Sequence, residues 1–167
     1  MFKELFAPIL GVIAFIIVVG LFVQKSDSIK IPGVTPLATT SATKTITVGS
    51  KVVNIEIVDT PEKRSQGLSG RTELATDTGM LFVFDIKDLT PGFWMKDMKM
   101  SIDIIWINDG KIVKIDKSVP KPEPGTPDNK LPTYSPGQPI DYVLEVNAGF
   151  SDLNNIKVGD SVDLTTL

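Results

Sequence analysis

Hydrophobic residues follow two different patterns along this 167-residue chain. Residues 5–23 form one apolar run without a charged side chain. From residue 44 onward, apolar positions come in short segments. Where they alternate with polar ones they predict half-buried β-strands, because successive strand side chains point to opposite faces, and where they are continuous, as at 80–84 and 93–95, they predict buried strands. The pattern therefore predicts four parts: a short N-terminal tail (1–4), a membrane-spanning helix (5–23), a flexible Thr/Ser/Pro linker (24–43) and one β-rich domain (44–167).

The β-rich region contains the turn signals that separate short strands. Gly49-Ser50 joins the strands of a first predicted hairpin, and Asp109-Gly110 joins a second, since Asp-Gly supplies the positive φ angles of a tight turn. Thr60-Pro61 predicts the start of a short helix that ends at Gly67. These elements predict a mainly β fold, either a compact β-sandwich or a barrel, with one or two short helices. Strands are expected at residues 45–48, 52–58, 80–84, 93–95, 102–108, 112–116, 142–146 and 161–165, and a second short helix at 150–155.

Residues 118–140 interrupt this alternation. They hold seven of the twelve prolines and show almost no apolar periodicity. We expect a long surface loop here, of a length that often belongs to a binding loop or a lid.

The apolar run at residues 5–23 has the length of a membrane span. At 1.5 Å per residue, its 19 residues extend over about 28 Å, close to the hydrocarbon thickness of a bilayer. A buried core helix normally carries one polar stripe, and this segment has none. The alternative is a cleaved signal peptide, whose apolar region is usually shorter, about 7–15 residues. An uncleaved anchor is the favoured interpretation.

Charge does not determine the orientation of this helix. Lys3 and the α-amine on one side are matched by Lys25 and Lys30 on the other. The linker favours a domain outside the cytoplasm, because Pro32, Pro36 and a Thr/Ser-rich stretch form a semi-extended stalk. We therefore expect a single-pass protein of the cell membrane, with its domain outside the cytoplasm.

The sequence contains no Cys and no His. This excludes thiolate nucleophiles, metal sites built from Cys or His, and His-dependent catalytic triads. Residues 44–167 carry 14 basic and 18 acidic side chains, a net charge of −4 that is a poor match for phosphate backbones. We therefore predict no cofactor, no metal and no nucleic-acid partner.

Several motifs of the β-rich region follow one another in a familiar order. The first is RSQGLSGRTEL, followed by GMLFVF, FWMKDM, IDIIWINDGKIVKI, YVLEVNAGF and IKVGDSV. With these motifs, about residues 45–164 resemble the family called domain of unknown function 192, whose biochemical activity is not established. The resemblance implies a compact, mainly β domain of jelly-roll-like form, often exported or placed behind an N-terminal membrane segment.

One departure from this family concerns the loop before Tyr134. Many relatives carry a Cys-Pro-x-Tyr arrangement, whereas this chain has Leu131-Pro132 in that place. A role that rests on this thiol is therefore absent here. Tyr134 and its polar neighbours are the ligand-binding candidates of the loop.

The segment Phe93-Trp94-Met95-Lys96 is the first candidate site. Trp94 offers a stacking face, and Lys96 offers a positive charge to an anionic or hydroxylated ligand. The alternative is that the apolar residues fill the core, while Lys96 is solvated or ion-paired at the end of a strand.

Three further charged residues are ligand-binding candidates. Arg64 would supply a bidentate clamp for a carboxylate or phosphate, or else a surface ion pair. Asp103 lies in an apolar strand and needs a partner there, for which Arg64 and Lys96 are the candidates. Glu145 occupies a similar position in its own strand. Asp103 and Glu145 would form the carboxylate pair of a glycoside hydrolase only if both faced one cleft.

These observations favour a non-enzymatic binding or interaction module, with an envelope glycan, a peptide or a protein as its ligand. No catalytic residue is assigned, because the sequence contains no adequate catalytic set. One alternative is an envelope glycan hydrolase with Asp or Glu catalysts. The other is a structural accessory subunit of an envelope complex, which would present a large exposed apolar patch.

The predicted orientation can be tested on intact cells. Protease added outside should digest residues 44–167 if the domain lies outside the cytoplasm, because exposed loops and the linker are accessible to cleavage. A C-terminal tag followed by immunoblotting measures the loss, and a cytoplasmic marker protein is the control. A domain that stays fully protected until the cells are lysed would overturn the orientation.

Overall fold

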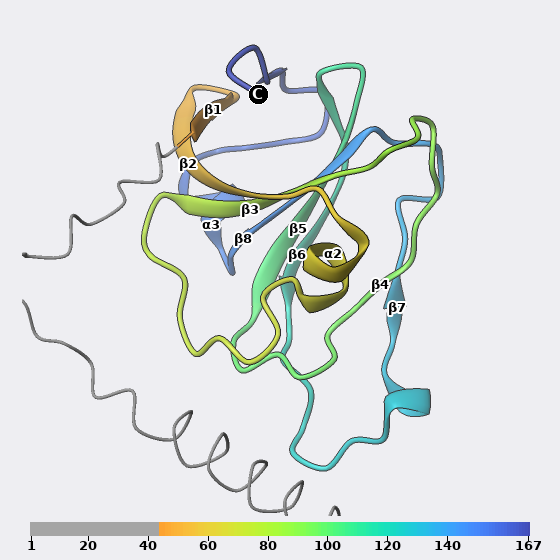
Figure 1. Ribbon diagram of the computed structural model, residues 1–167. Coiled ribbons are helices and arrows are strands. Elements are labelled where there is room, and N and C mark those ends of the chain that lie inside the picture. The colour runs from red at the N-terminus through yellow and green to blue at the C-terminus, as the bar shows by residue number, and fades with distance from the viewer. Residues whose placement is uncertain (1–43) are drawn as a thin grey trace, which may run out of the picture. The chain divides into compact units, whose positions relative to one another are not determined.

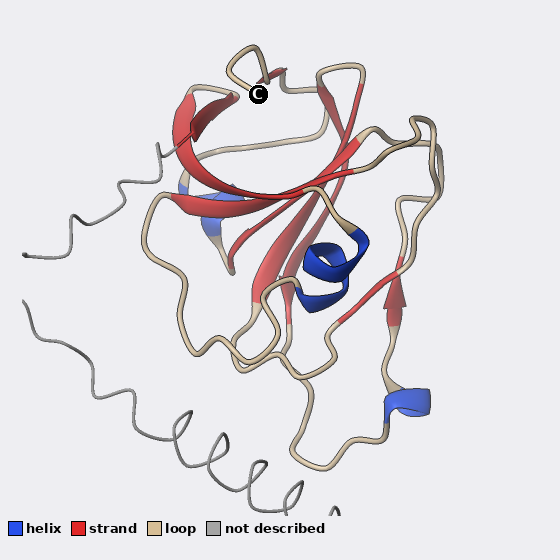
Figure 2. Cartoon of the chain, viewed as in Figure 1, coloured by secondary structure: helices blue, strands red, loops and turns tan. Residues whose placement is uncertain are grey.

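The computed structural model describes residues 44–167, so the predicted anchor at 5–23 and the linker at 24–43 lie outside the described residues. Within the described part, no helix is both long enough and apolar enough to cross a membrane. Strands dominate the domain, and the helices are short (Figure 1, Figure 2). In chain order the elements are β1 (Lys44–Val48), β2 (Lys51–Val58), α2 (Pro61–Gln66), β3 (Thr78–Val83), β4 (Phe93–Trp94), β5 (Ile102–Asn108), β6 (Lys111–Val119), the 3-10 turn η1 (Asp128–Lys130), β7 (Thr133–Tyr134), β8 (Tyr142–Asn147), α3 (Phe150–Leu153) and β9 (Val162–Asp163).

Seven of the strands form one sheet that nearly closes into a barrel (Figure 1). Their order is β6-β5-β8-β3-β2-β1-β9, and only β2 and β3 pair in parallel, joined through α2. The two edges of the sheet, β9 and the β5–β6 hairpin, meet through backbone hydrogen bonds. The Val162 N–H donates to the Gly110 carbonyl over 2.7 Å, and the Ile112 N–H donates to the Asp160 carbonyl over 3.0 Å. Of the two predicted architectures, the molecule adopts the barrel-like one.

Both predicted hairpins are confirmed. β1 and β2 pair around Gly49-Ser50, and β5 and β6 pair around Asp109-Gly110. Asp109 and Gly110 have φ angles of 47° and 66°, the left-handed conformation that an Asp-Gly turn accommodates. The turn chemistry predicted from the sequence therefore sets the register of the two hairpins.

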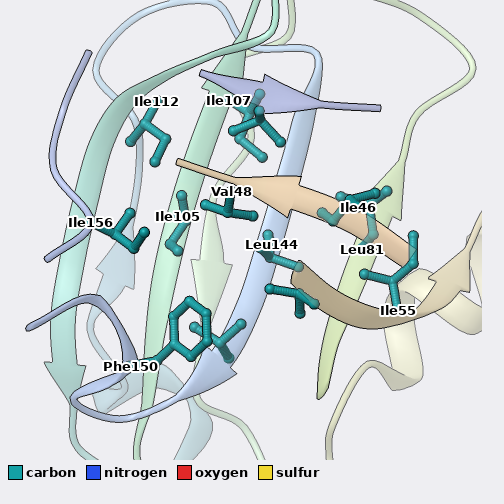
Figure 3. Close-up of a cluster of buried hydrophobic side chains, with 13 residues drawn as sticks. Ile46, Val48, Ile55, Leu81, Ile105, Ile107, Ile112, Leu144, Phe150 and Ile156 are labelled. Atoms are coloured by element: carbon teal, nitrogen blue, oxygen red, sulfur yellow. The ribbon is translucent and has the colours of Figure 1, made fainter. Parts of the chain in front are cut away.

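The inside of the barrel is an apolar core to which all seven strands contribute (Figure 3). Ile105 of β5 and Leu144 of β8 are fully buried within it. Phe150 of α3 packs against the same cluster. Because side chains alternate along a strand, the neighbouring residues of β5 and β8 face the outside of the barrel.

A second apolar core covers that outer face. It combines Phe82, Trp106 and Val143 from the sheet with Leu68 and Met98 from connecting segments. β5 and β8 are consequently buried on both faces along most of their length. Strands of this kind read as continuous apolar runs, which explains the IDIIWI and YVLEV segments of the sequence.

Helix α2 begins and ends as the sequence predicts. The Thr60 side chain accepts the Lys63 N–H over 3.3 Å, and Pro61 occupies the first turn, where a helix needs no N–H. The helix ends at Gly67, which has a φ of 47°. A Cβ atom built at Gly67 would lie 3.3 Å from Cζ of Phe82, so glycine allows the helix end to approach this ring.

The long loop predicted at residues 118–140 is partly ordered into elements, which corrects that prediction. β6 extends to Val119, and β7 pairs with β4 so that Tyr134 lies opposite Phe93 and Thr133 opposite Trp94. A pairing of two residues on each strand has no periodicity that a sequence could reveal. It ties the Pro-rich segment to the FWMK segment (Figure 1).

Asp103 has a partner different from the one that the sequence suggested. Its carboxylate is fully buried on the inward face of β5. Oδ1 accepts the N–H groups of Ser118 and Gly149 over 2.8 and 3.0 Å, and Oδ2 accepts the N–H of Ser151 over 2.8 Å. The predicted pairing of Asp103 with Arg64 or Lys96 is therefore wrong. Backbone donors from β6 and the start of α3 replace the cation.

Replacement of Asp103 by Asn should destabilise the domain by about 2–4 kcal/mol, because one of the three N–H groups would then face an amide NH2 group. Denaturant unfolding, followed through the fluorescence of buried Trp106, measures the change. The matched control is Asp152→Asn in α3, since Asp152 is exposed and pairs only with Lys117. An equal loss in the two variants would contradict a structural role specific to Asp103.

Candidate functional site

A cavity of about 310 Å³ opens on the outer face of the sheet, beside α2. Residues 64–69 of α2 and the following turn form one wall, and β3, β4 and β8 provide the others. Its lining combines apolar side chains with polar residues of α2 and the turn that follows it, and ligand cavities in proteins commonly join apolar walls to a few polar groups. Its aromatic residues are Phe82, Phe84, Phe93 and Trp94.

The aromatic rings are held by edge-to-face contacts. Phe82 and Phe93 meet with ring centroids 4.9 Å apart at an interplanar angle of 75°. Phe93 in turn contacts Trp106 at 5.4 Å and 81°. Such perpendicular pairs are the favoured arrangement of aromatic rings. The inner wall of the cavity is therefore anchored to the second apolar core.

Glu145 is the buried polar group of the cavity. Its strand neighbours across the sheet are Met80 of β3 and Ile104 of β5, so the carboxyl group is surrounded by apolar side chains. Only 7% of the residue is exposed, and within residues 44–167 no hydrogen bond or ion pair perturbs its carboxyl group. Burial raises the pKa of Glu145 to about 8. At neutral pH the group is therefore mainly protonated and can donate a hydrogen bond.

Arg64 lies at the edge of the cavity with its guanidinium group already bound. One nitrogen donates to the carbonyls of Asp59 and Val83, both over 2.8 Å. The other terminal nitrogen donates to the carboxylate of Asp85 over 3.0 Å. The group also lies 5.7 Å from the ring centre of Phe84. Arg64 thus fastens α2 to the end of β3, and its charge is balanced by Asp85.

Trp94 and Lys96 lie beside each other at the mouth of the cavity. The Lys96 ammonium group is 5.4 Å from the ring centre of Trp94, and it forms an ion pair with Asp128 of η1. This hydrogen bond raises the pKa of Lys96. Lys96 does not line the main cavity but a neighbouring hollow, and Trp94 lines both. The ion-paired alternative for Lys96 is therefore the arrangement found.

Two of the predicted site residues lie away from the cavity. Tyr134 is half-buried against the second core, opposite Phe93 in the β4–β7 pair. Asp103 lies opposite Val146, one position away from Glu145 along the sheet, so the two acids point to opposite faces. They do not share a cleft, and the carboxylate pair of a glycoside hydrolase is not formed.

The structure also adds residues that sequence reasoning did not single out. Phe82 and Phe84 line the cavity together with Leu68 and Met98. A signal was present, because Phe82 and Phe84 alternate in the GMLFVF segment and therefore share a face. No pattern connects that face with Glu145, which lies more than sixty positions away in the chain.

The described residues contain no metal-binding constellation. Within 44–167, no group of three or more Asp or Glu side chains is arranged to hold an ion. The polar residues that line the cavity are Glu145, Arg64, Ser65, Gln66 and Ser69.

The nearly closed seven-stranded sheet places the molecule among small barrel-like β domains. Residues 43–164 match the model of the DUF192 family, which is described as "Uncharacterized ACR". The chain belongs to this family, as its motifs predicted. A search of curated proteins finds no match.

Two solved structures resemble the domain. A protein from Sinorhizobium meliloti 1021, described as a suggested transcription regulator, is 28% identical with a TM-score of 0.63, covering 74% of this chain and 92% of that chain. A protein of unknown function from Novosphingobium aromaticivorans is 29% identical with a TM-score of 0.63, covering 71% of this chain and 83% of that chain. The family and these structures support the fold, and the function has to be argued from the cavity.

The raised pKa of Glu145 should make the stability of the domain depend on pH. The folded state holds a proton up to a pH of about 8, whereas an unfolded glutamate releases it near 4.5. The contribution of protonated Glu145 to the free energy of unfolding is therefore fully present below pH 4.5, and it is lost as the pH rises to about 8. The loss should amount to ~3–5 kcal/mol in the free energy of unfolding.

Denaturant unfolding at a series of pH values measures this dependence. Glu145→Gln removes the titrating group and keeps its shape, so the variant should lack this part of the pH dependence. Curves for the two proteins that run parallel between pH 5 and 8 would contradict the assignment.

Proposed function

We propose that the domain is a non-enzymatic binding module, and that the cavity beside α2 receives a group of its ligand. The ligand is an envelope glycan, a peptide or a protein that presents a small group to the cavity. Residues 5–23 tether the module to the cell membrane, with the domain outside the cytoplasm.

The observation that carries this proposal is the unpartnered carboxyl group of Glu145, which borders the cavity between apolar side chains of the neighbouring strands. A buried polar group without a partner weakens a fold, since its hydrogen-bonding capacity is lost relative to water. Replacing Glu145 by an apolar residue would relieve that cost. A ligand that accepts or donates a hydrogen bond there would satisfy the carboxyl group. Ligand binding therefore explains an acid at this position, whereas packing does not.

The shape of the cavity supports the same proposal. Trp94 is 52% exposed and borders the cavity, so a ligand that enters would cover apolar surface now in contact with water. Phe82 and Phe93 are held by the core, so the inner wall is already formed. A preformed wall lowers the ordering cost of binding.

The two alternatives receive less support. Asp103 and Glu145 lie on opposite faces of the sheet, so the carboxylate pair of the hydrolase alternative has no geometric basis. An accessory subunit would need a broad apolar surface. The exposed large apolar residues within 44–167 instead come from separate segments of the chain: Val52, Ile86, Trp94, Leu153, Val158 and Leu167.

Trp94→Ala should weaken ligand binding and leave the fold intact, because the ring is half exposed and covers the mouth of the cavity. The loss should be about 1–3 kcal/mol of binding free energy, the range for an aromatic contact residue. Arrays of cell-wall glycans and peptides identify the ligand, and titration calorimetry compares the two proteins. Val52→Ala is the control, since Val52 is exposed to 55% and does not line this cavity.

A variant that unfolds would identify Trp94 as a packing residue, and thermal unfolding distinguishes this outcome from lost affinity. Equal binding by the wild-type protein and the folded Trp94→Ala variant would place the ligand elsewhere on the domain.

A further inference from the structure

Glu145 and the rings around it also indicate which chemical class of ligand fits the cavity. Four aromatic residues line it: Phe82, Phe84, Phe93 and Trp94. The face of an aromatic ring is electron-rich and attracts cations, and sites built from several rings recognise ammonium groups. An unpaired carboxyl group adjoins these rings. Rings and carboxyl together therefore match a cation better than an anion.

The charged groups around Glu145 are few. Among the residues that line the cavity, Arg64 is the other ionisable one, and it comes from α2. Its guanidinium group is bound to the carbonyls of Asp59 and Val83 and to the carboxylate of Asp85. The cavity-lining residues of β3, β4 and the segment around Met98 contribute no charge.

An ionised Glu145 would therefore need one cation as its partner, and the described residues do not provide it. Its cross-strand neighbours Met80 and Ile104 are apolar, and Lys96 is engaged with Asp128 in the neighbouring hollow. An ionised carboxylate at this position becomes favourable only when a cation enters.

On this basis, and resting on the proposed binding function, we propose that the cavity binds the ammonium group of its ligand, with Glu145 as the counter-ion and the aromatic rings as its walls. The volume of about 310 Å³ admits an amino-sugar residue or an amine-bearing side chain. The shared chemistry of these ligands is a positively charged primary amine on a small, partly apolar group.

Binding includes one proton transfer. The neutral carboxyl group of Glu145 loses its proton to solvent, and the carboxylate that forms accepts a hydrogen bond from the ammonium group. No covalent bond in the ligand changes. Because burial places the pKa of Glu145 at about 8, close to one proton should be released per ligand at pH 7.

A neutral ligand would behave in the opposite way. A carbonyl or hydroxyl oxygen accepts a hydrogen bond from protonated Glu145, so its binding releases no proton and weakens as the pH rises past 8. Binding of an ammonium group strengthens as the pH rises from 6 to 8, as long as the amine stays charged. The sign of the pH dependence thus distinguishes the two classes.

The test uses the full-length chain in nanodiscs of zwitterionic lipid, with empty nanodiscs as the blank. Calorimetry compares benzylamine with benzyl alcohol, which have similar size and differ in charge. Each titration is repeated at pH 7 in two buffers of different ionisation enthalpy, which gives the number of protons released. We expect benzylamine to bind with release of close to one proton, and benzyl alcohol to bind about tenfold more weakly or worse.

Two variants locate the effect. Glu145→Gln should lower the affinity for benzylamine about ten- to a hundredfold, because a charged hydrogen bond is lost, and should leave benzyl alcohol unchanged. Glu73→Gln is the matched control, since Glu73 is exposed and does not line the cavity. The proton count on the wild-type protein needs no variant and therefore stands even if a variant folds poorly.

Two further pairs identify the source of the amine. Glucosamine is compared with N-acetylglucosamine, and a short lysine-containing peptide is compared with its fully acetylated form. Preference for glucosamine indicates a glycan, preference for the free peptide indicates a peptide, and preference for benzylamine alone indicates a small free amine. Each result supports an ammonium site.

The opposite results separate the two proposals. If the neutral member of each pair binds as tightly as the charged one, without proton release, the ammonium inference is wrong and the binding cavity stands. If neither member of any pair binds, the ammonium inference is wrong. If, in addition, the arrays identify a ligand whose affinity is unchanged by Trp94→Ala, the binding site lies outside the cavity, and the proposed function of the cavity is wrong as well.

Discussion

The burial of β5 and β8 on both faces is the constraint on which the rest of the structure depends. Closure of the sheet through β9 covers the inner faces of these strands, and Leu68 in the turn after α2, the β4–β7 pair and the connecting segments cover the outer faces. A polar side chain on either face is then removed from water, and it needs a partner from the protein or from a ligand. The domain places two acids in these strands, and the constraint acts differently on each.

Asp103 and Glu145 show the two outcomes. The Asp103 carboxylate meets three backbone N–H groups where β6 and α3 converge, so its charge is accommodated and it fastens these segments. Glu145 lies between Met80 and Ile104, which have no donor to offer, and burial keeps it protonated at neutral pH. The first acid stabilises the fold. The second is maintained against an unfavourable burial, which is why we assign it to the ligand.

The outer layer determines the form of the cavity. Gly67 lets the end of α2 approach Phe82, and Arg64 fastens the helix to the carbonyl of Val83 at the end of β3. The β4–β7 pair holds Phe93 against the second core and leaves Trp94 at the mouth. Asp85 pairs with Arg64, and Asp128 pairs with Lys96, so neither cation at this edge is available to Glu145. Glu145 is therefore the acid of the cavity that has no partner among the described residues. The family and the similar solved structures share the fold, and the chemistry of this cavity adds what their descriptions leave open.

The sequence by itself determined the local elements and the family. Alternation and short apolar runs predicted the long strands, Thr60-Pro61 and Gly67 bounded α2, and Asp109-Gly110 placed a hairpin, because each of these signals acts over a few neighbouring residues. The tertiary structure decided the partners of the buried acids, since backbone donors and apolar neighbours come from segments distant in the chain. It also decided the β4–β7 pairing, which is too short to have a period. The cavity joins α2, β3, β4 and β8, and only the folded sheet brings them to one place.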